Sequence, residues 1–192
     1  MISTYFKSVI GGNPLKASII YQLIGFGALI TLGLSFYQKD KKRIMFWQIA
    51  AFVIFCTHYA LIGARSGALC NLVQIATLIL FCLRDRYGWK KVYIAVPILL
   101  GYAVIAVVTY ESPVSLLSVA ASIIGMAPFF QSNKNVIRGA GIASDAVWLG
   151  YAIFVRSYSA IITNIVLIAV TFVSFFERHK KKSGQAEEPD VK

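Results

Sequence analysis

Two asparagines, Asn71 and Asn164, lie inside apolar segments, and each follows an aromatic residue by 16 positions, Phe55 in the first case and Trp148 in the second. An amide offers a hydrogen-bond donor and an acceptor, and an aromatic ring stacks on the apolar face of a ligand. This combination suits a small polar solute with an apolar face, such as a sugar or a nucleoside. The alternative is that the amides hydrogen-bond across helices and only fix their packing.

Two ionisable residues also lie well inside apolar segments, where a charge is costly and often marks function. Asp145 is three residues before Trp148, so both share a helix face. It could carry a coupling proton, bond to a carbonyl as a neutral acid, or pair with a basic residue on the cytoplasmic side. His58, three residues after Phe55, could be a proton relay. We prefer a structural histidine bonded to a backbone carbonyl.

Two glutamines end apolar segments, each directly after an aromatic pair. Gln38 follows Phe36–Tyr37, and Gln131 follows Phe129–Phe130. Each amide could cap the end of its helix, or the two could form an inner gate. Both interpretations place the pair at the same end of the molecule.

A shift of 93 residues brings these polar landmarks into register. The aligned pairs are Phe36 and Phe129, Gln38 and Gln131, Lys41 and Lys134, Phe55 and Trp148, Ser66 and Ser159, and Asn71 and Asn164. Two copies of a three-segment unit, joined by one extra segment, are a known way to build a membrane transporter. The register therefore predicts an internal repeat.

The elements that must position these side chains are seven apolar stretches of 17 to 21 residues. They are Ala17–Tyr37, Ile44–Gly63, Gly67–Leu83, Val92–Tyr110, Pro113–Phe130, Gly139–Val155 and Ser159–Phe176. The chain is 58% hydrophobic, which is more apolar surface than a water-soluble domain of 192 residues can bury. Each stretch is long enough to cross a bilayer as a helix. The sequence predicts an all-α multi-pass membrane protein with seven transmembrane helices.

The predicted organisation is three helices, one linker helix and three helices. A short N-terminal segment covers residues 1–16, and the first three-helix repeat covers 17–83. The linker helix is 92–110, the second repeat is 113–176, and a disordered tail of basic and acidic residues is 177–192. A three-span unit begins and ends on opposite sides of the membrane. The linker helix restores the orientation, so the two three-helix bundles are parallel.

The net charge of +11 is concentrated in alternate connections. Basic residues follow the first, third, fifth and seventh apolar stretches, whereas the opposite connections hold only Arg65, Glu111 and Arg156. This pattern places the N-terminus outside and the C-terminus in the cytoplasm. It also speaks against nucleic-acid binding.

The expected partners are the lipid bilayer and a small polar solute. An oligomer is compatible with the sequence but not indicated by it. We expect no enzyme, because no catalytic set, metal cluster or cofactor motif is present.

The residues resemble two groups of membrane proteins. Trp148-Leu-Gly-Tyr151 followed by Asn164 is similar to the pocket pattern of the SWEET and SemiSWEET sugar facilitators of the PQ-loop superfamily, which have parallel repeats. The first half keeps Tyr59 and Asn71 but has Phe55 for the tryptophan, and neither Gln38 nor Gln131 directly follows a proline. The closer resemblance is to YgjV-type bacterial inner membrane proteins, through IGFGALITLGLSFYQKDKKRIMFWQ, His58-Tyr59-Ala-Leu-Ile-Gly63-Ala and Gly67-Ala-Leu-Cys-Asn71.

The predicted function is passage of a small polar solute through a pocket between the two repeats of an inner membrane protein. Asn71, Asn164, Trp148 and Phe55 would line this pocket. The alternative is a membrane interaction protein that transports nothing. A pocket too small or too dry for a solute would favour this alternative.

Overall fold

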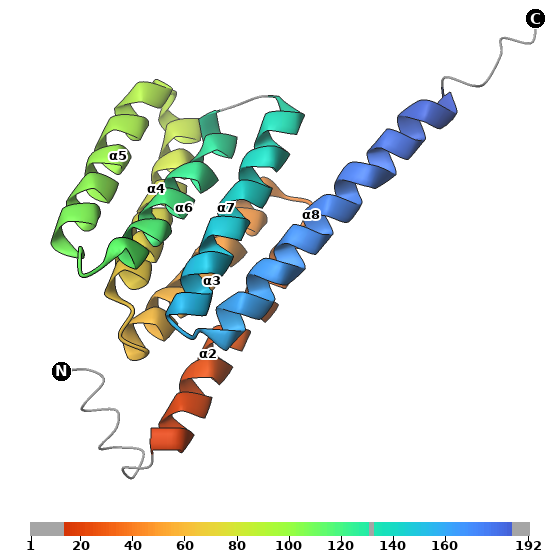
Figure 1. Cartoon of the computed structure of the whole chain (residues 1–192). Coiled ribbons are helices and arrows are strands. Elements are labelled where there is room, and N and C mark those ends of the chain that lie inside the picture. Colours follow the sequence, from red (N-terminus) through yellow and green to blue (C-terminus); the bar gives the residue numbers. More distant parts are fainter. Residues whose placement is uncertain (1–13, 131–132, 186–192) are drawn as a thin grey trace, which may run out of the picture.

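The computed structural model describes residues 14–130 and 133–185, and within these ranges all regular structure is helical. The described residues form seven α-helices, and their arrangement is drawn in Figure 1. They are α2 (Pro14–Phe36), α3 (Lys41–Leu61), α4 (Arg65–Tyr87), α5 (Lys91–Val108), α6 (Pro113–Phe130), α7 (Lys134–Phe154) and α8 (Tyr158–Gln185). The prediction of an all-helical protein is confirmed.

The helix ends follow local sequence signals. Pro14 and Pro113 are the first residues of α2 and α6, where the N–H that proline lacks has no partner inside the helix. Gly88 ends α4 in the left-handed conformation, with φ of 70°, and its N–H donates to the carbonyl of Arg84 at 2.7 Å. The bounds of α6 are those of the predicted stretch, and most other ends lie within a few residues of the prediction.

The prediction of a disordered tail over residues 177–192 was wrong for residues 177–185, because α8 continues to Gln185. Residues of this segment such as Glu177 and Lys180 have high helix propensity. They extend a helix that is already formed, so no new nucleation is needed. Residues 186–192 lie outside the described residues. So do residues 1–13 of the predicted N-terminal segment, whereas residues 14–16 begin α2.

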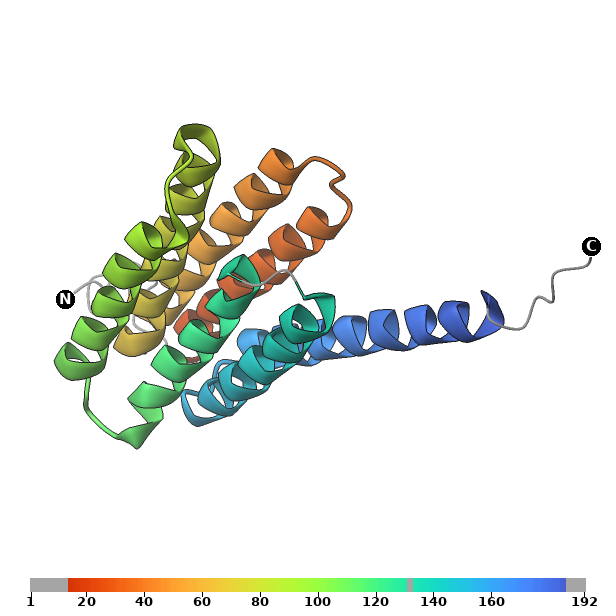
Figure 2. The same ribbon diagram turned by 90° about the horizontal axis from the view of Figure 1, so that it is seen from above.

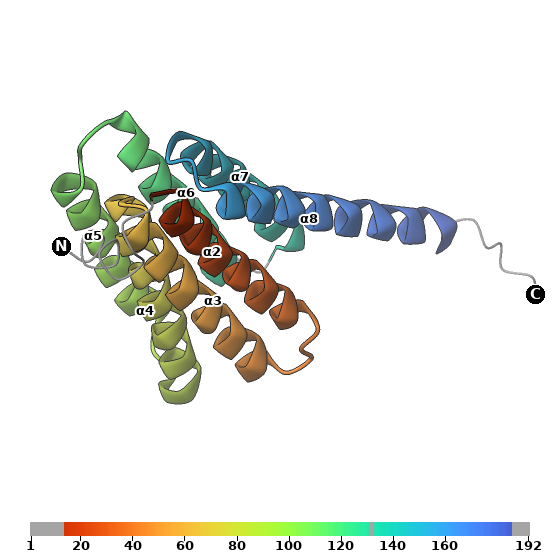
Figure 3. The ribbon, with the colours of Figure 1, turned by 90° about the horizontal axis from the view of Figure 1, so that it is seen from below.

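Six of the helices form a closed ring. Around it, α2 contacts α3, α3 contacts α4, α4 contacts α6, α6 contacts α7, α7 contacts α8, and α8 contacts α2. Among the described helices α5 contacts α4 and α6 only, so it lies outside the ring. Figure 2 shows α5 at one edge of the bundle, and the view from below in Figure 3 shows α2 between α3 and α8. The C-terminal part of α8 extends away from the bundle (Figure 1).

Polar side chains lie inside the bundle and large apolar ones cover its surface. His58, Ser118 and Asn71 are buried, while Ile30 and Val107 are more than half exposed. A bilayer accommodates such a surface, whereas water does not. The stretches Ser18–Ser35, Lys42–Leu61, Arg65–Tyr87 and Lys91–Val108 are long and apolar enough to span a membrane. Shorter apolar helices cover Pro113–Pro128 and Tyr158–Val173.

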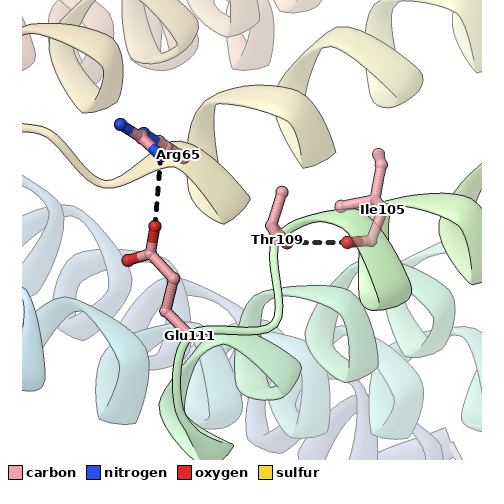
Figure 4. A network of polar contacts seen from close by, with 4 residues as sticks. All are labelled: Arg65, Ile105, Thr109 and Glu111. Atoms are coloured by element: carbon pink, nitrogen blue, oxygen red, sulfur yellow. Dashed lines mark hydrogen bonds and ion pairs between the residues drawn. The ribbon is translucent and has the colours of Figure 1, made fainter.

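The connection between α5 and α6 lies against the start of α4. The Nη1 atom of Arg65 is 3.3 Å from Oε1 of Glu111, and both side chains are largely exposed (Figure 4). At the start of this connection, the hydroxyl of Thr109 donates to the carbonyl of Ile105 at 2.7 Å. An exposed ion pair contributes little to stability. Its value here is to show which helix ends lie together at this end of the bundle.

Candidate functional site

A cavity of about 350 Å³ lies within the ring of six helices. All six ring helices contribute to its lining, and no described residue of α5 does. The polar and aromatic lining residues include Gln48 and Phe55 of α3, Asn71 and Gln74 of α4, Ser122 of α6, Asp145 and Trp148 of α7, and Asn164 of α8. The four predicted solute-binding residues therefore lie on one cavity.

An aromatic layer, made of Phe55, Tyr59, Trp148 and Tyr151, lies beside the cavity. The ring of Tyr59 stacks on Trp148 with centroids 5.9 Å apart, and it lies 6.2 Å from Phe55 and 5.8 Å from Tyr151. Trp148 and Tyr151 meet edge to face at 5.6 Å. These rings come from α3 and α7, near the ends that lead into α4 and α8. Three of the four rings, those of Phe55, Tyr59 and Trp148, line the cavity.

The hydroxyl of Tyr151 fixes the start of α4 beneath the aromatic layer. It lies 2.9 Å from Oγ of Ser66, and it accepts a hydrogen bond of 2.9 Å from the backbone N–H of Gly67. The N–H groups of the first turn of a helix have no partner within the helix. Tyr151, which is 1% exposed, supplies one of these partners from α7.

His58 holds the start of α8 in a corresponding way. Its Nδ1 is 2.7 Å from the carbonyl oxygen of Tyr21, and its Nε2 is 2.7 Å from Oγ of Ser157. Because a carbonyl oxygen only accepts, Nδ1 carries the proton and Nε2 is free to accept from the serine hydroxyl. His58 is fully buried and does not line the cavity. It makes the carbonyl bond expected of a structural histidine.

Asn71 and Asn164 make the same local hydrogen bond. The Nδ2 of Asn71 donates to the carbonyl of Gly67 at 2.8 Å, and that of Asn164 donates to the carbonyl of Ala160 at 2.7 Å. Each bond stays within its own helix, and among the described residues neither amide joins two helices. The Oδ1 atoms remain as acceptors on side chains that line the cavity.

Asp145 also lines the cavity and lies one helical turn before Trp148. In the described part of the chain its carboxylate has no hydrogen bond to a carbonyl and no ion pair with a basic residue. Two of the three alternatives drawn from the sequence are thus not seen there.

The two predicted glutamines are not brought together by the described residues. Gln38 lies just after α2, and its Nε2 donates to the carbonyl of Leu34 at 3.3 Å, which is the contact of a helix cap. Gln131 lies outside the described residues. An inner gate made of both side chains stays a prediction.

Two further amides on the cavity were missed by sequence reasoning. Gln48 and Gln74 line it, and Nε2 of Gln74 donates to Oγ of Ser122 at 3.2 Å. A shift of 93 residues places them on Gly141 and Leu167, so comparing the two halves does not reveal them. The presence of a glutamine in the middle of an apolar stretch is the signal that would have found Gln74.

Comparison with known proteins identifies the family. A family model described as "Bacterial inner membrane protein", Imp-YgjV, matches residues 19–182. The chain belongs to the Imp-YgjV family. The match includes residues of all seven helices, and it confirms the YgjV-type resemblance and an inner membrane location. No curated protein and no solved structure matches the chain. The similarity to SWEET proteins therefore stays a prediction.

Proposed function

We propose that this inner membrane protein passes a small polar solute through the cavity between α2–α4 and α6–α8. The observation that carries this proposal is the cavity itself. Its volume of about 350 Å³ lies in the range of small-molecule sites, roughly 300–1,000 Å³. Its lining combines aromatic rings with amides and a carboxylate. A membrane interaction protein has no need of a cavity of this size and polarity.

The three-plus-one-plus-three arrangement is part of the proposal. Two observations support it, and the first is the register of helix ends. α3 begins at Lys41 and α7 at Lys134, α3 ends at Leu61 and α7 at Phe154, and each pair is 93 residues apart. The starts of α4 and α8, at Arg65 and Tyr158, are separated by the same distance.

The second supporting observation is the turn between the last two helices of each half. The N–H of Ala64 donates to the carbonyl of Tyr59, and the N–H of Ser157 donates to that of Ala152, both at 2.9 Å. Gly63 and Arg156 take equivalent places with φ of 83° and 56°. An arginine seldom adopts this conformation. Its presence here is explained if the turn is inherited from a repeat.

The proposed orientation places the N-terminus outside and the C-terminus in the cytoplasm. The aromatic layer and the buried contacts of His58 and Tyr151 close the end near the α3–α4 and α7–α8 connections. Gln48 and Gly141, near the starts of α3 and α7, are only half-buried. The basic connections lie at this second end, which the positive-inside rule assigns to the cytoplasm. In this proposal a solute enters the cavity from the cytoplasmic end, and the aromatic layer faces the periplasm.

The roles of the lining residues follow from their chemistry. Trp148 and Phe55 offer apolar faces at the closed end, and Asn71 and Asn164 offer amide oxygens. We assign the protein no catalytic step, no cofactor and no nucleic-acid partner. Its partners in this proposal are the bilayer and the solute.

A reconstitution experiment tests the proposal. Purified protein in liposomes is compared with protein-free liposomes for entry of sugars, polyols, nucleosides, vitamins and small amines. We expect at least one of these solutes to enter faster with the protein present. If entry is equal for every solute, the protein is better described as a membrane interaction protein.

A further inference from the structure

The charge of the cavity lining is one-sided. Asp145 is the one acidic side chain among its described residues, which include no lysine, arginine or histidine. No described residue pairs with its carboxylate. Removing a carboxylate from water is costly unless a cation or several hydrogen-bond donors face it. In its ionised form this carboxylate therefore requires a cation or hydrogen-bond donors from a bound solute.

The neutral polar groups of the lining add to this requirement. The hydroxyls of Thr77, Ser122 and Thr163 donate to carbonyls of their own helices at 2.7–2.8 Å, and that of Ser144 donates to the carbonyl of Ala121 at 2.8 Å. With these donors occupied, the hydroxyl oxygens keep only lone pairs for a solute. The Oδ1 atoms of Asn71 and Asn164 are likewise acceptors. These hydroxyl and amide oxygens therefore suit a solute that donates hydrogen bonds.

Aromatic side chains lie on the same cavity as the carboxylate. Trp148 follows Asp145 by one helical turn, and Phe52 and Phe55 line the cavity from α3. The faces of aromatic rings attract cations, tryptophan most strongly. They also pack against aliphatic groups. A carboxylate together with such rings is complementary to an ammonium group attached to an apolar body.

We propose that the solute of this cavity is a small organic cation, with a primary or secondary ammonium group paired to Asp145 and an apolar body against Trp148 and Phe55. This inference rests on the proposed function and deepens it by naming the substrate class. A neutral sugar leaves the carboxylate without a counter-charge. An anion is repelled by it, since the described lining offers no cation to hold it.

Trp148 provides a direct test by fluorescence. The chain has three tryptophans, so Trp47→Phe together with Trp89→Phe leaves Trp148 as the only reporter. This variant in detergent is titrated at pH 7 with cyclohexylmethylammonium and with cyclohexylmethanol, its neutral isostere. We expect a saturable change in fluorescence and at least tenfold tighter binding of the ammonium. Equal affinities for the two probes would overturn the proposal.

Variants that change one acidic residue test whether the tighter binding of the ammonium probe depends on the carboxylate of Asp145. In the same background, Asp145→Asn is expected to remove the tenfold difference, and Asp145→Glu to retain it. Asp40→Asn makes the same chemical change at an exposed position outside the cavity, and is expected to retain the difference. A thermal melt shows that each variant is folded. Retention of the preference in a folded Asp145→Asn protein contradicts the inference.

Different results would contradict the proposed substrate class and the proposed transport function. If neither probe binds but a neutral sugar or polyol changes Trp148 fluorescence saturably, the cation inference is wrong and solute binding by the cavity stands. If no solute of any class changes the fluorescence and none enters liposomes, both are wrong.

Discussion

His58 and Tyr151 are 93 residues apart and make corresponding contacts in opposite directions. His58 of α3 bonds to Ser157, immediately before α8, and Tyr151 of α7 bonds to Ser66 and Gly67 at the start of α4. Each side chain is at most 1% exposed. Thus α3 holds the start of α8, and α7 holds the start of α4. These crossed contacts join α2–α4 to α6–α8.

We predict that Tyr151→Phe destabilises the protein. The change removes only the hydroxyl, which leaves the buried N–H of Gly67 without this partner. An unsatisfied buried donor costs roughly 1–3 kcal/mol. The melting temperature should fall clearly, whereas Tyr158→Phe, at a side chain 61% exposed, should leave it nearly unchanged. Equal melting temperatures for both variants would show that the crossed contact is dispensable.

A second prediction concerns the approach of α2 to α8. A Cβ atom at Gly25 would collide with the side chain of Ser159 and lie 3.1 Å from Nδ1 of His58, whereas one at Gly27 would meet nothing within 4 Å. Gly25→Ala should therefore separate the helices and lower the melting temperature. Gly27→Ala should have no effect or a small stabilising one, because alanine favours helix. The close approach is refuted if both variants melt alike.

The sequence was sufficient for the helices and for the polar landmarks of the cavity. Apolar stretches give the helices directly, since a bilayer requires each span to satisfy its own backbone. The 93-residue register aligns Asn71 with Asn164, and both line one cavity. The register does not reveal Gln48 and Gln74, which have no polar counterpart in the second half.

Other features depend on packing that no local pattern encodes. Tyr151 and Gly67 are 84 residues apart, and their bond exists only because α7 and α4 meet beneath the aromatic layer. The carboxylate of Asp145 was recognised as significant, but three roles for it stayed open. Only the lining of the cavity showed that no cation stands beside it among the described residues. The length of α8 was missed because hydropathy marks where a membrane span ends, not where a helix ends.

We predict that Asn164→Ala reduces solute passage more than it reduces stability. The amide bonds to a carbonyl of its own helix, so little packing between helices is lost. The loss of a solute hydrogen bond should weaken binding by roughly 1–3 kcal/mol. Ile165→Ala, at a side chain 51% exposed, is the control. Unchanged passage with a sharply lower melting temperature would make Asn164 a packing residue.

Cysteine labelling tests the proposed orientation. With Cys56, Cys70 and Cys82 replaced by serine, a single cysteine is placed at Asp40 or at Glu111, both exposed in connections at opposite ends of the bundle. A membrane-impermeant maleimide applied to spheroplasts should label position 111 and not position 40. Lysis should expose position 40. Labelling of position 40 alone in intact spheroplasts means that the topology is inverted.

The most direct test of the central claim is to plug the cavity and measure passage. Gly141 lines the cavity and has free space around it, so phenylalanine there should fill the cavity without disturbing the fold. Gly139, two residues earlier on α7, also has free space but is exposed outside the cavity. In liposomes, with a solute that the wild-type protein passes, we expect Gly141→Phe to abolish entry and Gly139→Phe to retain it. Equal entry through both folded variants would contradict a solute path through this cavity.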